Sequence, residues 1–423
     1  MRIMLTVPVY KDNFDWKSWD KKLKDMIVDH KVNLIVFPEG FIGDVPLDEL
    51  EDEVQYLGDL FQCSVLTGIG GIDGSQWAVY YNPIPDDGET EWKVYCKHST
   101  ARTIAFDIPE YDEEHDILFE PIYFMGKRIQ VNICHDIFFP MITERMRREG
   151  LDVLINLTGG NVTPSKWHNV FRGRSYEMDA PILCTMGYDP EKSGVSEAFA
   201  YFKGKQLKAV VRKGSITKQQ PEIAVFDLSN LQTEMTEPEV SASNKIYNDF
   251  TVAFSMERKA DLQIALSSSG LIVRDTTQKT ITQKTIEIED EFALLCRDVS
   301  VTFLPYRLLK DRTAVLKHCD TSAESHIVVY HSVRPVDVDE CLSLLKLRVI
   351  ENRIGAVIVS PNLKAGMKTN RYKNIQLFYP VEDMIGFDLN FLGGPNSVFS
   401  NSSSLLGIHR KHKDKYYSLV NLD

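Results

Sequence analysis

The stretch Arg128-Ile-Gln-Val-Asn-Ile-Cys134, continued by His-Asp-Ile-Phe-Phe-Pro140, places a thiol directly after an apolar run. The run is short and rich in β-branched residues, which predicts a buried strand. A short helix is predicted at 140–149 and another strand at 152–157. A strand, a helix and a second strand in this order are typical of an α/β layered domain.

The same alternation extends in both directions from this stretch. A helix predicted at 165–180 ends before Pro181, as expected for the residue that precedes a proline. The segment 98–121 is polar and acidic and predicts a loop. Other helices are predicted at 15–29 and 47–61, and strands at 2–9, 34–37, 64–70, 76–82, 92–97, 182–187, 197–202, 206–212 and 222–227. Gly68-Ile-Gly-Gly71 is interpreted as a tight strand exit, because it lacks the spacing of a phosphate-binding loop.

The chain has 423 residues, enough for two or three domains of about 100–200 residues each. Apolar periodicity lapses in a polar segment at 229–245, which is therefore predicted to link an N-terminal domain, residues 1–228, to a second α/β domain, residues 246–423. Alternation within 276–285 predicts an exposed β-ribbon.

The second half shows a faint echo of the first. Residues 326–361 repeat the pattern of residues 2–38, and two C-terminal segments parallel two late segments of the first half (393–399 with 194–199, and 416–423 with 221–228). Such a repeat would be non-catalytic, because Pro361-Asn362 stands where the first half has Pro38-Glu39. The alternative is that any two α/β segments look alike.

Charge and cysteine content exclude several classes of protein. Lys and Arg number 48 against 60 Asp and Glu, a net charge of −12, so we expect neither nucleic acid nor anionic membrane as a partner. No apolar run is long enough to span a bilayer, and the N-terminal run is too short for a signal peptide. The seven cysteines are odd in number and lack zinc-ligand spacing. We expect a cytoplasmic protein with free thiols, no metal and no organic cofactor.

Three polar residues follow predicted strands directly: Glu39, Lys97 and Cys134. Ligand sites in α/β sheets form at the carboxyl ends of strands, so these side chains can converge. A thiol is mostly protonated at neutral pH, and a carboxylate can take its proton during attack. An ammonium can stabilise the resulting oxyanion. Taken singly, such a cysteine is more often a buried apolar residue, and a lone Glu or Lys is usually solvated.

The neighbours of Cys134 allow another reading. His135 would pair with the thiol in a protease-like dyad, but adjacent side chains diverge unless a sharp turn intervenes, so this reading is disfavoured. Asp136 is expected to bond to the local backbone of the turn.

The motifs around these residues are Phe37-Pro-Glu39, Tyr95-Cys-Lys-His98 and Cys134-His-Asp-Ile-Phe-Phe-Pro140, and together they resemble the nitrilase (carbon–nitrogen hydrolase) superfamily in the family's order. Residues 152–157, Trp167 with Arg174-Ser-Tyr-Glu177, and Gly194-Val-Ser196 resemble its later segments. The resemblance covers residues 1–228. His135, the Ser-Thr-Ala-Arg after His98, and Met178 depart from the usual pattern, which puts the substrate in doubt.

The resemblance implies an α-β-β-α sandwich. Glu39 would be the general base, Lys97 the oxyanion stabiliser and Cys134 the nucleophile, with the backbone N–H of His135 in the oxyanion hole. A second glutamate usually follows the lysine, and Glu113 is preferred over Glu114 for that place.

The activity that these roles imply is hydrolysis of a non-peptide carbon–nitrogen bond in a small amide, through a cysteine thioester. Nitrile hydrolysis and a glutaminase remain alternatives, although no Gly-rich pyrophosphate loop indicates a synthetase partner domain. The competing hypothesis from another class is an inactive assembly or partner-binding module. The chain would form homo-oligomers, or its second half would mimic the family's dimer partner.

Overall fold

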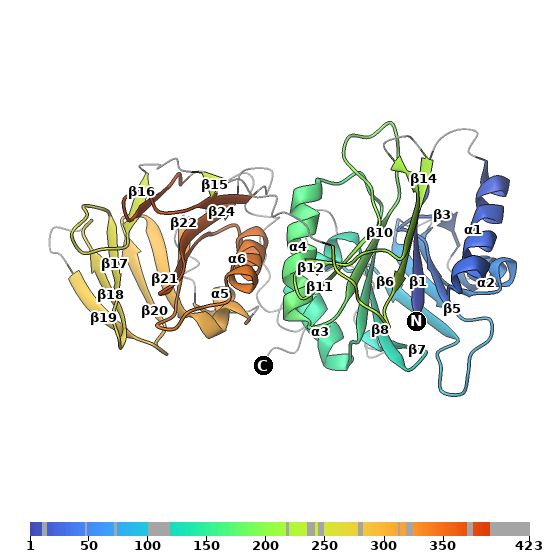
Figure 1. The fold of residues 1–423 in the computed structure, drawn as a ribbon, viewed down its shortest axis with the longest axis horizontal. Helices are drawn as coiled ribbons and strands as arrows, with labels where there is room; N and C mark the ends of the chain where they lie inside the picture. Colours follow the sequence, from blue (N-terminus) through green and yellow to red (C-terminus); the bar gives the residue numbers. More distant parts are fainter. Residues whose placement is uncertain are drawn as a thin grey trace. The chain divides into compact units, whose positions relative to one another are not determined.

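The computed structural model describes residues 1–10, 15–46, 49–71, 74–99, 119–216, 220–234, 242–243, 249–277, 282–311, 314–318, 325–369 and 375–389. The chain divides into two compact units, unit 1 (Met1–Thr236) and unit 2 (Glu237–Asp423) (Figure 1). The division lies within the segment predicted as a linker.

The larger sheet of unit 1 has eight strands in the order β13-β14-β1-β2-β4-β5-β6, with β3 paired to β4. β6 is antiparallel to β5, and β5 to β4, so β6 runs in the same direction as the parallel strands β1, β2 and β4. The carboxyl ends of β2 and β6 therefore lie at the same edge. The strands are β1 (Arg2–Val7), β2 (Leu34–Val36), β3 (Ile42–Val45), β4 (Ser64–Gly71), β5 (Gln76–Tyr81), β6 (Trp92–Cys96), β13 (Val211–Ser215) and β14 (Gln220–Asp227).

The second sheet of unit 1 has six strands in sequence order, β12-β11-β10-β9-β8-β7. Its central strands β8, β9 and β10 are parallel, and the strands at either end are antiparallel to their neighbours. The strands are β7 (Ile122–Phe124), β8 (Lys127–Ile133), β9 (Val153–Thr158), β10 (Ile182–Met186), β11 (Phe199–Phe202) and β12 (Lys205–Gln206). β8 ends directly before Cys134, so this sheet carries the thiol.

Unit 1 is an α-β-β-α sandwich. The sheets face each other where β5 and β6 contact β8, and where β1 contacts β10. Helices α1 (Trp16–His30) and α2 (Leu50–Phe61) cover the outer side of the eight-stranded sheet, and α3 (Pro140–Glu149) and α4 (Pro164–Glu177) lie on the six-stranded side (Figure 1). Buried side chains of α1 and α2, which include Trp19, Leu23, Val54 and Phe61, pack with side chains of the larger sheet, which include Met4, Ile35 and Val65.

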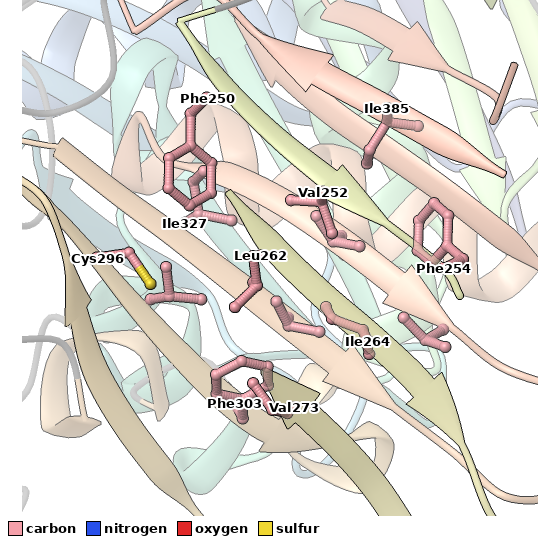
Figure 2. Packing of buried hydrophobic residues seen from close by; sticks show 14 of the residues in the cluster. Phe250, Val252, Phe254, Leu262, Ile264, Val273, Cys296, Phe303, Ile327 and Ile385 are labelled. Atoms are coloured by element: carbon pink, nitrogen blue, oxygen red, sulfur yellow. The ribbon is translucent and has the colours of Figure 1, made fainter. Parts of the chain in front are cut away.

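Unit 2 contains a seven-stranded sheet, β15-β25-β24-β23-β22-β21-β20, and a five-stranded sheet, β19-β18-β17-β16-β26. Apolar side chains from both sheets form one core (Figure 2), including Phe250, Leu262, Val273, Phe303, Ile327 and Val357. Helix α6 packs on β23, β24 and β25. The elements are β15 (Ala242–Ser243), β16 (Phe250–Ala253), β17 (Leu262–Leu266), β18 (Gly270–Asp275), β19 (Thr282–Glu287), β20 (Phe292–Cys296), β21 (Val299–Pro305), α5 (Ala314–His318), β22 (Ser325–His331), α6 (Val338–Asn352), β23 (Gly355–Val359), β24 (Lys364–Thr369), β25 (Ile375–Phe378) and β26 (Met384–Phe387).

The expected elements differ from the observed ones in a few places. The predicted strand at 206–212 is two strands, β12 and β13, which belong to different sheets. β3 was not predicted at all. Of the ribbon predicted at 276–285, residues 282–285 belong to β19, which pairs antiparallel with β18, and residues 278–281 lie outside the described residues. Among the described residues, no helix is both long and apolar enough to cross a membrane.

Candidate active site

Glu39 is held at the end of β2 by a close backbone approach to β4. Phe37 N–H donates to the carbonyl of Leu66, and Gly68 N–H donates to the carbonyl of Pro38. A Cβ on Gly68 would collide with the backbone of Pro38 and Glu39, so only glycine fits there. Gly68 therefore lies inside β4, and the stretch 68–71 that the sequence predicted as a strand exit forms the last four residues of that strand.

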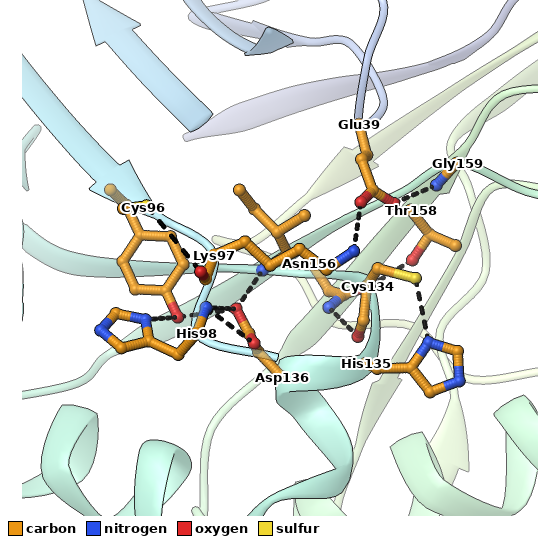
Figure 3. A network of polar contacts seen from close by, with 12 residues as sticks. Glu39, Cys96, Lys97, His98, Cys134, His135, Asp136, Asn156, Thr158 and Gly159 are labelled. Atoms are coloured by element: carbon orange, nitrogen blue, oxygen red, sulfur yellow. Dashed lines mark hydrogen bonds and ion pairs between the residues drawn. The ribbon is translucent and has the colours of Figure 1, made fainter. Parts of the chain in front are cut away.

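Glu39 and Lys97 form an ion pair, with 2.5 Å between Oε1 and Nζ (Figure 3). The other carboxylate oxygen of Glu39 accepts from Gly159 N–H at 2.8 Å. Burial alone would lower the pKa of the Lys97 ammonium, but its electrostatic interactions with Cys134 and Glu39 and its hydrogen bond with Glu39 outweigh burial and raise that pKa. Lys97 therefore stays charged at neutral pH. Gly159 was missed because a backbone N–H leaves no signal in the sequence.

Cys134 begins the 3-10 helix Cys134–Phe138 (η3) that follows β8. It has a φ of 49°, a left-handed conformation that is unfavourable by roughly 1–2 kcal/mol for a residue with a Cβ. Its carbonyl accepts from Nδ2 of Asn156, which lies on β9, at 3.1 Å. Surrounding bonds must hold such a conformation in place, so the sharp turn is a built feature of the site.

The electrostatics of the thiol are set by its surroundings. Burial raises the pKa of Cys134, the Glu39 carboxylate raises it further, and Lys97 opposes the rise. The net shift is upward, so the resting thiol is protonated. An attack by this sulfur therefore needs a base at the moment of reaction. Glu39 and Asp136 are the carboxylates whose charges act on the thiol, and Glu39 also has a side-chain hydrogen bond with it.

Asp136 connects the turn of Cys134 to the segment that carries Lys97. It is fully buried and accepts from Tyr95 Oη at 2.8 Å, His98 N–H at 3.2 Å and Ile133 N–H at 3.3 Å. The bond to Ile133 confirms the expected contact with local backbone. The other two bonds reach across to the eight-stranded sheet, so one carboxylate links the two sheets beside the thiol and the ammonium.

The family comparison rests on the part of the chain that carries this geometry. Residues 14–196 match the family model for carbon–nitrogen hydrolases. Unit 1 belongs to the carbon–nitrogen hydrolase (nitrilase) superfamily. The match includes Glu39, Lys97 and Cys134, and it ends well before unit 2. The match therefore supports the resemblance of unit 1 to carbon–nitrogen hydrolases, and it does not extend into unit 2.

Several solved structures resemble part of the chain. A carbon–nitrogen hydrolase from Helicobacter pylori G27 is 18% identical, with 53% of this chain and 90% of that chain covered and a TM-score of 0.38. The NitN amidase from Nesterenkonia sp. AN1 is 15% identical, with 54% and 92% covered and a TM-score of 0.40. A variant of that amidase in complex with butyramide is 12% identical, with 53% and 90% covered and a TM-score of 0.41. No curated protein sequence matches the chain.

His135 in the carbon–nitrogen hydrolase domain departs from the sequence-based expectation. Its side chain does not diverge from Cys134, because the left-handed turn brings Nδ1 to 3.3 Å from Sγ. Its Nε2 lies 3.5 Å from Nζ of Lys166, and an ammonium can only donate. The imidazole of His135 therefore lies between the thiol of Cys134 and the ammonium of Lys166.

The second glutamate of the site, Glu113, and its alternative Glu114 lie outside the described residues, as does the rest of 100–118. The predicted site therefore divides into a part whose geometry is described (Glu39, Lys97 and Cys134) and a part that stays a prediction from the resemblance.

Replacing Asp136 by Asn should remove a pH-dependent contribution to the stability of the carbon–nitrogen hydrolase domain. Burial raises the pKa of Asp136 from its ordinary 3.8 to about 6, so between these values the folded protein binds more protons than the unfolded chain. The contribution of Asp136 to the free energy of unfolding therefore decreases as pH rises from about 4 to about 6, by on the order of 3 kcal/mol.

Denaturant titrations followed by tryptophan fluorescence measure this slope for unit 1 alone, because all five tryptophans of the chain lie there. The parent should lose stability across this pH window relative to Asp136→Asn. Equal slopes in the two proteins would show that Asp136 is ionised as easily in the fold as in the unfolded chain.

Proposed function

We propose that the protein is an amidase-type hydrolase of non-peptide carbon–nitrogen bonds that works through a thioester on Cys134. The observation that carries this proposal is the arrangement at the facing strand ends. A protonated thiol from one sheet lies in the electrostatic neighbourhood of a carboxylate and an ammonium from the other, and these two are themselves paired at 2.5 Å. This combination supplies a nucleophile, a base and an oxyanion stabiliser.

In the first half of the reaction, Sγ of Cys134 attacks the carbonyl carbon of the amide while Glu39 takes the thiol proton. The oxyanion of the tetrahedral intermediate is held by the ammonium of Lys97 and by the backbone N–H of His135. The intermediate collapses as the C–N bond breaks. The leaving nitrogen takes a proton from the carboxylic acid of Glu39 and departs as ammonia or an amine.

In the second half of the reaction, Glu39 is a carboxylate again because it has given its proton to the leaving nitrogen. Water attacks the thioester carbon and gives a proton to this carboxylate. The same two donors hold the second oxyanion. The C–S bond then breaks, the carboxylic acid product leaves, and the proton on Glu39 returns to the sulfur. One water is consumed for each amide. Glu113 is proposed as the further carboxylate of the site, on the resemblance alone.

Incubation of the protein with a panel of small primary amides, N-substituted amides and nitriles tests this proposal. Ammonia or amine release should occur with a subset of the amides. Intact-mass spectrometry during turnover should show an increment equal to the acyl group, and peptide mapping should place it on Cys134. Release with no acyl increment on any cysteine, or an increment on another cysteine, would contradict the thioester route. No release and no increment across the panel would favour the non-catalytic alternative.

A further inference from the structure

The seven-stranded sheet of unit 2 reproduces the strand arrangement of the sheet that carries Cys134. Strands β20 to β25 lie side by side in sequence order, as β7 to β12 do. The directions also agree, since in each set the three central strands β8–β10 and β21–β23 are parallel and the outer strands are antiparallel to their neighbours.

This correspondence changes the register of the repeat that the sequence suggested. Residues 326–361 do not correspond to 2–38, because β22 has parallel neighbours on both sides whereas β1 has the antiparallel β14 on one side. They correspond instead to β9, α4 and β10. The two segments keep nearly the same spacing. β22 begins 172 positions after β9, the helix N-caps Thr163 and Asp337 lie 174 positions apart, and β23 begins 173 positions after β10.

A buried ion pair recurs at the same place in both segments. In α4, Arg174 Nη1 lies 2.6 Å from Glu177 Oε2, and Arg174 Nε donates to the carbonyl of Ile137 at 2.9 Å. In α6, Arg348 Nη1 lies 2.7 Å from Glu351 Oε2, and Arg348 Nε donates to the carbonyl of Leu309 at 3.1 Å. All four charged side chains are 0% exposed. We call each set of three groups an arginine clamp.

The accepting carbonyls occupy equivalent places. Ile137 is the fourth residue of η3 after β8, and Leu309 is the fourth residue of the 3-10 helix Tyr306–Leu309 (η5) after β21. The first residues differ, since Cys134 is replaced by Tyr306. Cys134 has a positive φ and Tyr306 does not. The clamp therefore accompanies a strand followed by a 3-10 turn, whether or not that turn carries a thiol.

We infer that Arg174 and Glu177 position the turn that holds Cys134, and that unit 2 is a degenerate copy of this half of the domain that kept the clamp and lost the nucleophile. The role of the turn rests on the proposed function. Arg174 touches no reacting atom, so it is a positioning residue. Its planar guanidinium can bind the carboxylate and the carbonyl at once, and so ties α4 to the end of η3. A displacement of the turn by about 1 Å is enough to slow a reaction 100-fold.

The clamp can be removed without leaving a buried charge behind. Breaking one partner of a buried pair is destabilising, whereas replacing both by apolar residues is often neutral. Arg174→Met with Glu177→Leu is therefore the test variant, and Arg348→Met with Glu351→Leu is its matched control in unit 2. Arg174→Lys is a second test variant, because a lysine keeps a charge for Glu177 but lacks the planar fork.

The readout is the rate and pH profile of iodoacetamide alkylation of Cys134, followed by peptide mass spectrometry, beside unfolding monitored by tryptophan fluorescence. Alkylation needs no substrate, so the test does not depend on whether an amide is turned over. Both unit 1 variants should change the rate by about tenfold or more and alter the profile, while the control stays within about twofold of the parent.

A folded unit 1 double variant with the parent's rate and pH profile would overturn the positioning role. If that variant fails to fold, Arg174→Lys decides: a folded Arg174→Lys with the parent's profile also overturns it. An equal change in the unit 2 control would show that the effect is not specific to the turn of Cys134.

Discussion

Cys134→Ala should abolish hydrolysis of whichever amides the parent cleaves, with a loss in kcat/KM of about a thousandfold or more. The Ala side chain has no atom that can form the thioester, so the reaction loses its covalent route. Glu39 and Lys97 keep their 2.5 Å ion pair, and the fold should be retained. Ammonia release measured against protein concentration tests this expectation, together with the acyl increment, which should disappear.

Cys184→Ala is the matched control. Cys184 lies in β10, is fully buried and accepts from Thr158 Oγ1 or donates to it at 3.8 Å. It is close enough for its titration to be influenced by Cys134. Loss of one buried sulfur should lower stability by about 1 kcal/mol while turnover remains within a few-fold of the parent. If turnover survived Cys134→Ala but fell with Cys184→Ala, the nucleophile would be Cys184 and the assignment to Cys134 would be wrong.

Much of the domain fold was predictable because each strand and helix has its own local signal. The expected helix at 140–149 coincides with α3, and the order of strands in the first half is close to that observed. The division into two sheets was predictable only through the resemblance. A pattern of apolar residues does not say which strand pairs with which, and the split of 206–212 between two sheets is the clearest example.

The site was predictable to the extent that its groups directly follow strands. Glu39 and Lys97 come from β2 and β6 of one sheet and Cys134 from β8 of the other, and local sequence marks all three. The supporting contacts come from distant segments. Gly159 acts through its backbone N–H, and Asn156 acts from the middle of a strand. The contact of His135 with the thiol depends on a left-handed φ at Cys134. A positive φ at a residue other than glycine cannot be predicted from the sequence.

Glu39→Gln should slow both halves of the reaction by about a thousandfold or more in kcat, because the amide cannot accept the proton of the thiol or of the attacking water. Gln is nearly isosteric and its carbonyl oxygen can still accept from Gly159 N–H. Lys97 loses its carboxylate partner, and since Glu39 contributes to the upward shift in the pKa of Lys97, that pKa should fall. The ammonium remains charged at pH 7.

In Glu39→Gln, the defect in thioester hydrolysis should be easier to detect than the defect in acylation when the substrate is a reactive amide or ester. Such a carbonyl can acylate the thiol slowly without a base, while hydrolysis of the thioester still needs one. The acyl group should then accumulate on Cys134 over minutes to hours and appear in the intact mass of Glu39→Gln. In the parent, the same adduct should be transient.

Glu222→Gln provides the control for loss of a buried carboxylate. Glu222 lies in β14, forms an ion pair with Arg212 and accepts from Ala198 N–H, and it has no part in the proposed mechanism. Its replacement should lower stability but leave turnover within a few-fold of the parent, with no trapped adduct. If Glu39→Gln turned over amides at the parent's rate, the general base would have to be another group. The double variant Glu39→Gln with Cys134→Ala should show no adduct. An adduct that persisted in the double variant would not be the thioester of Cys134.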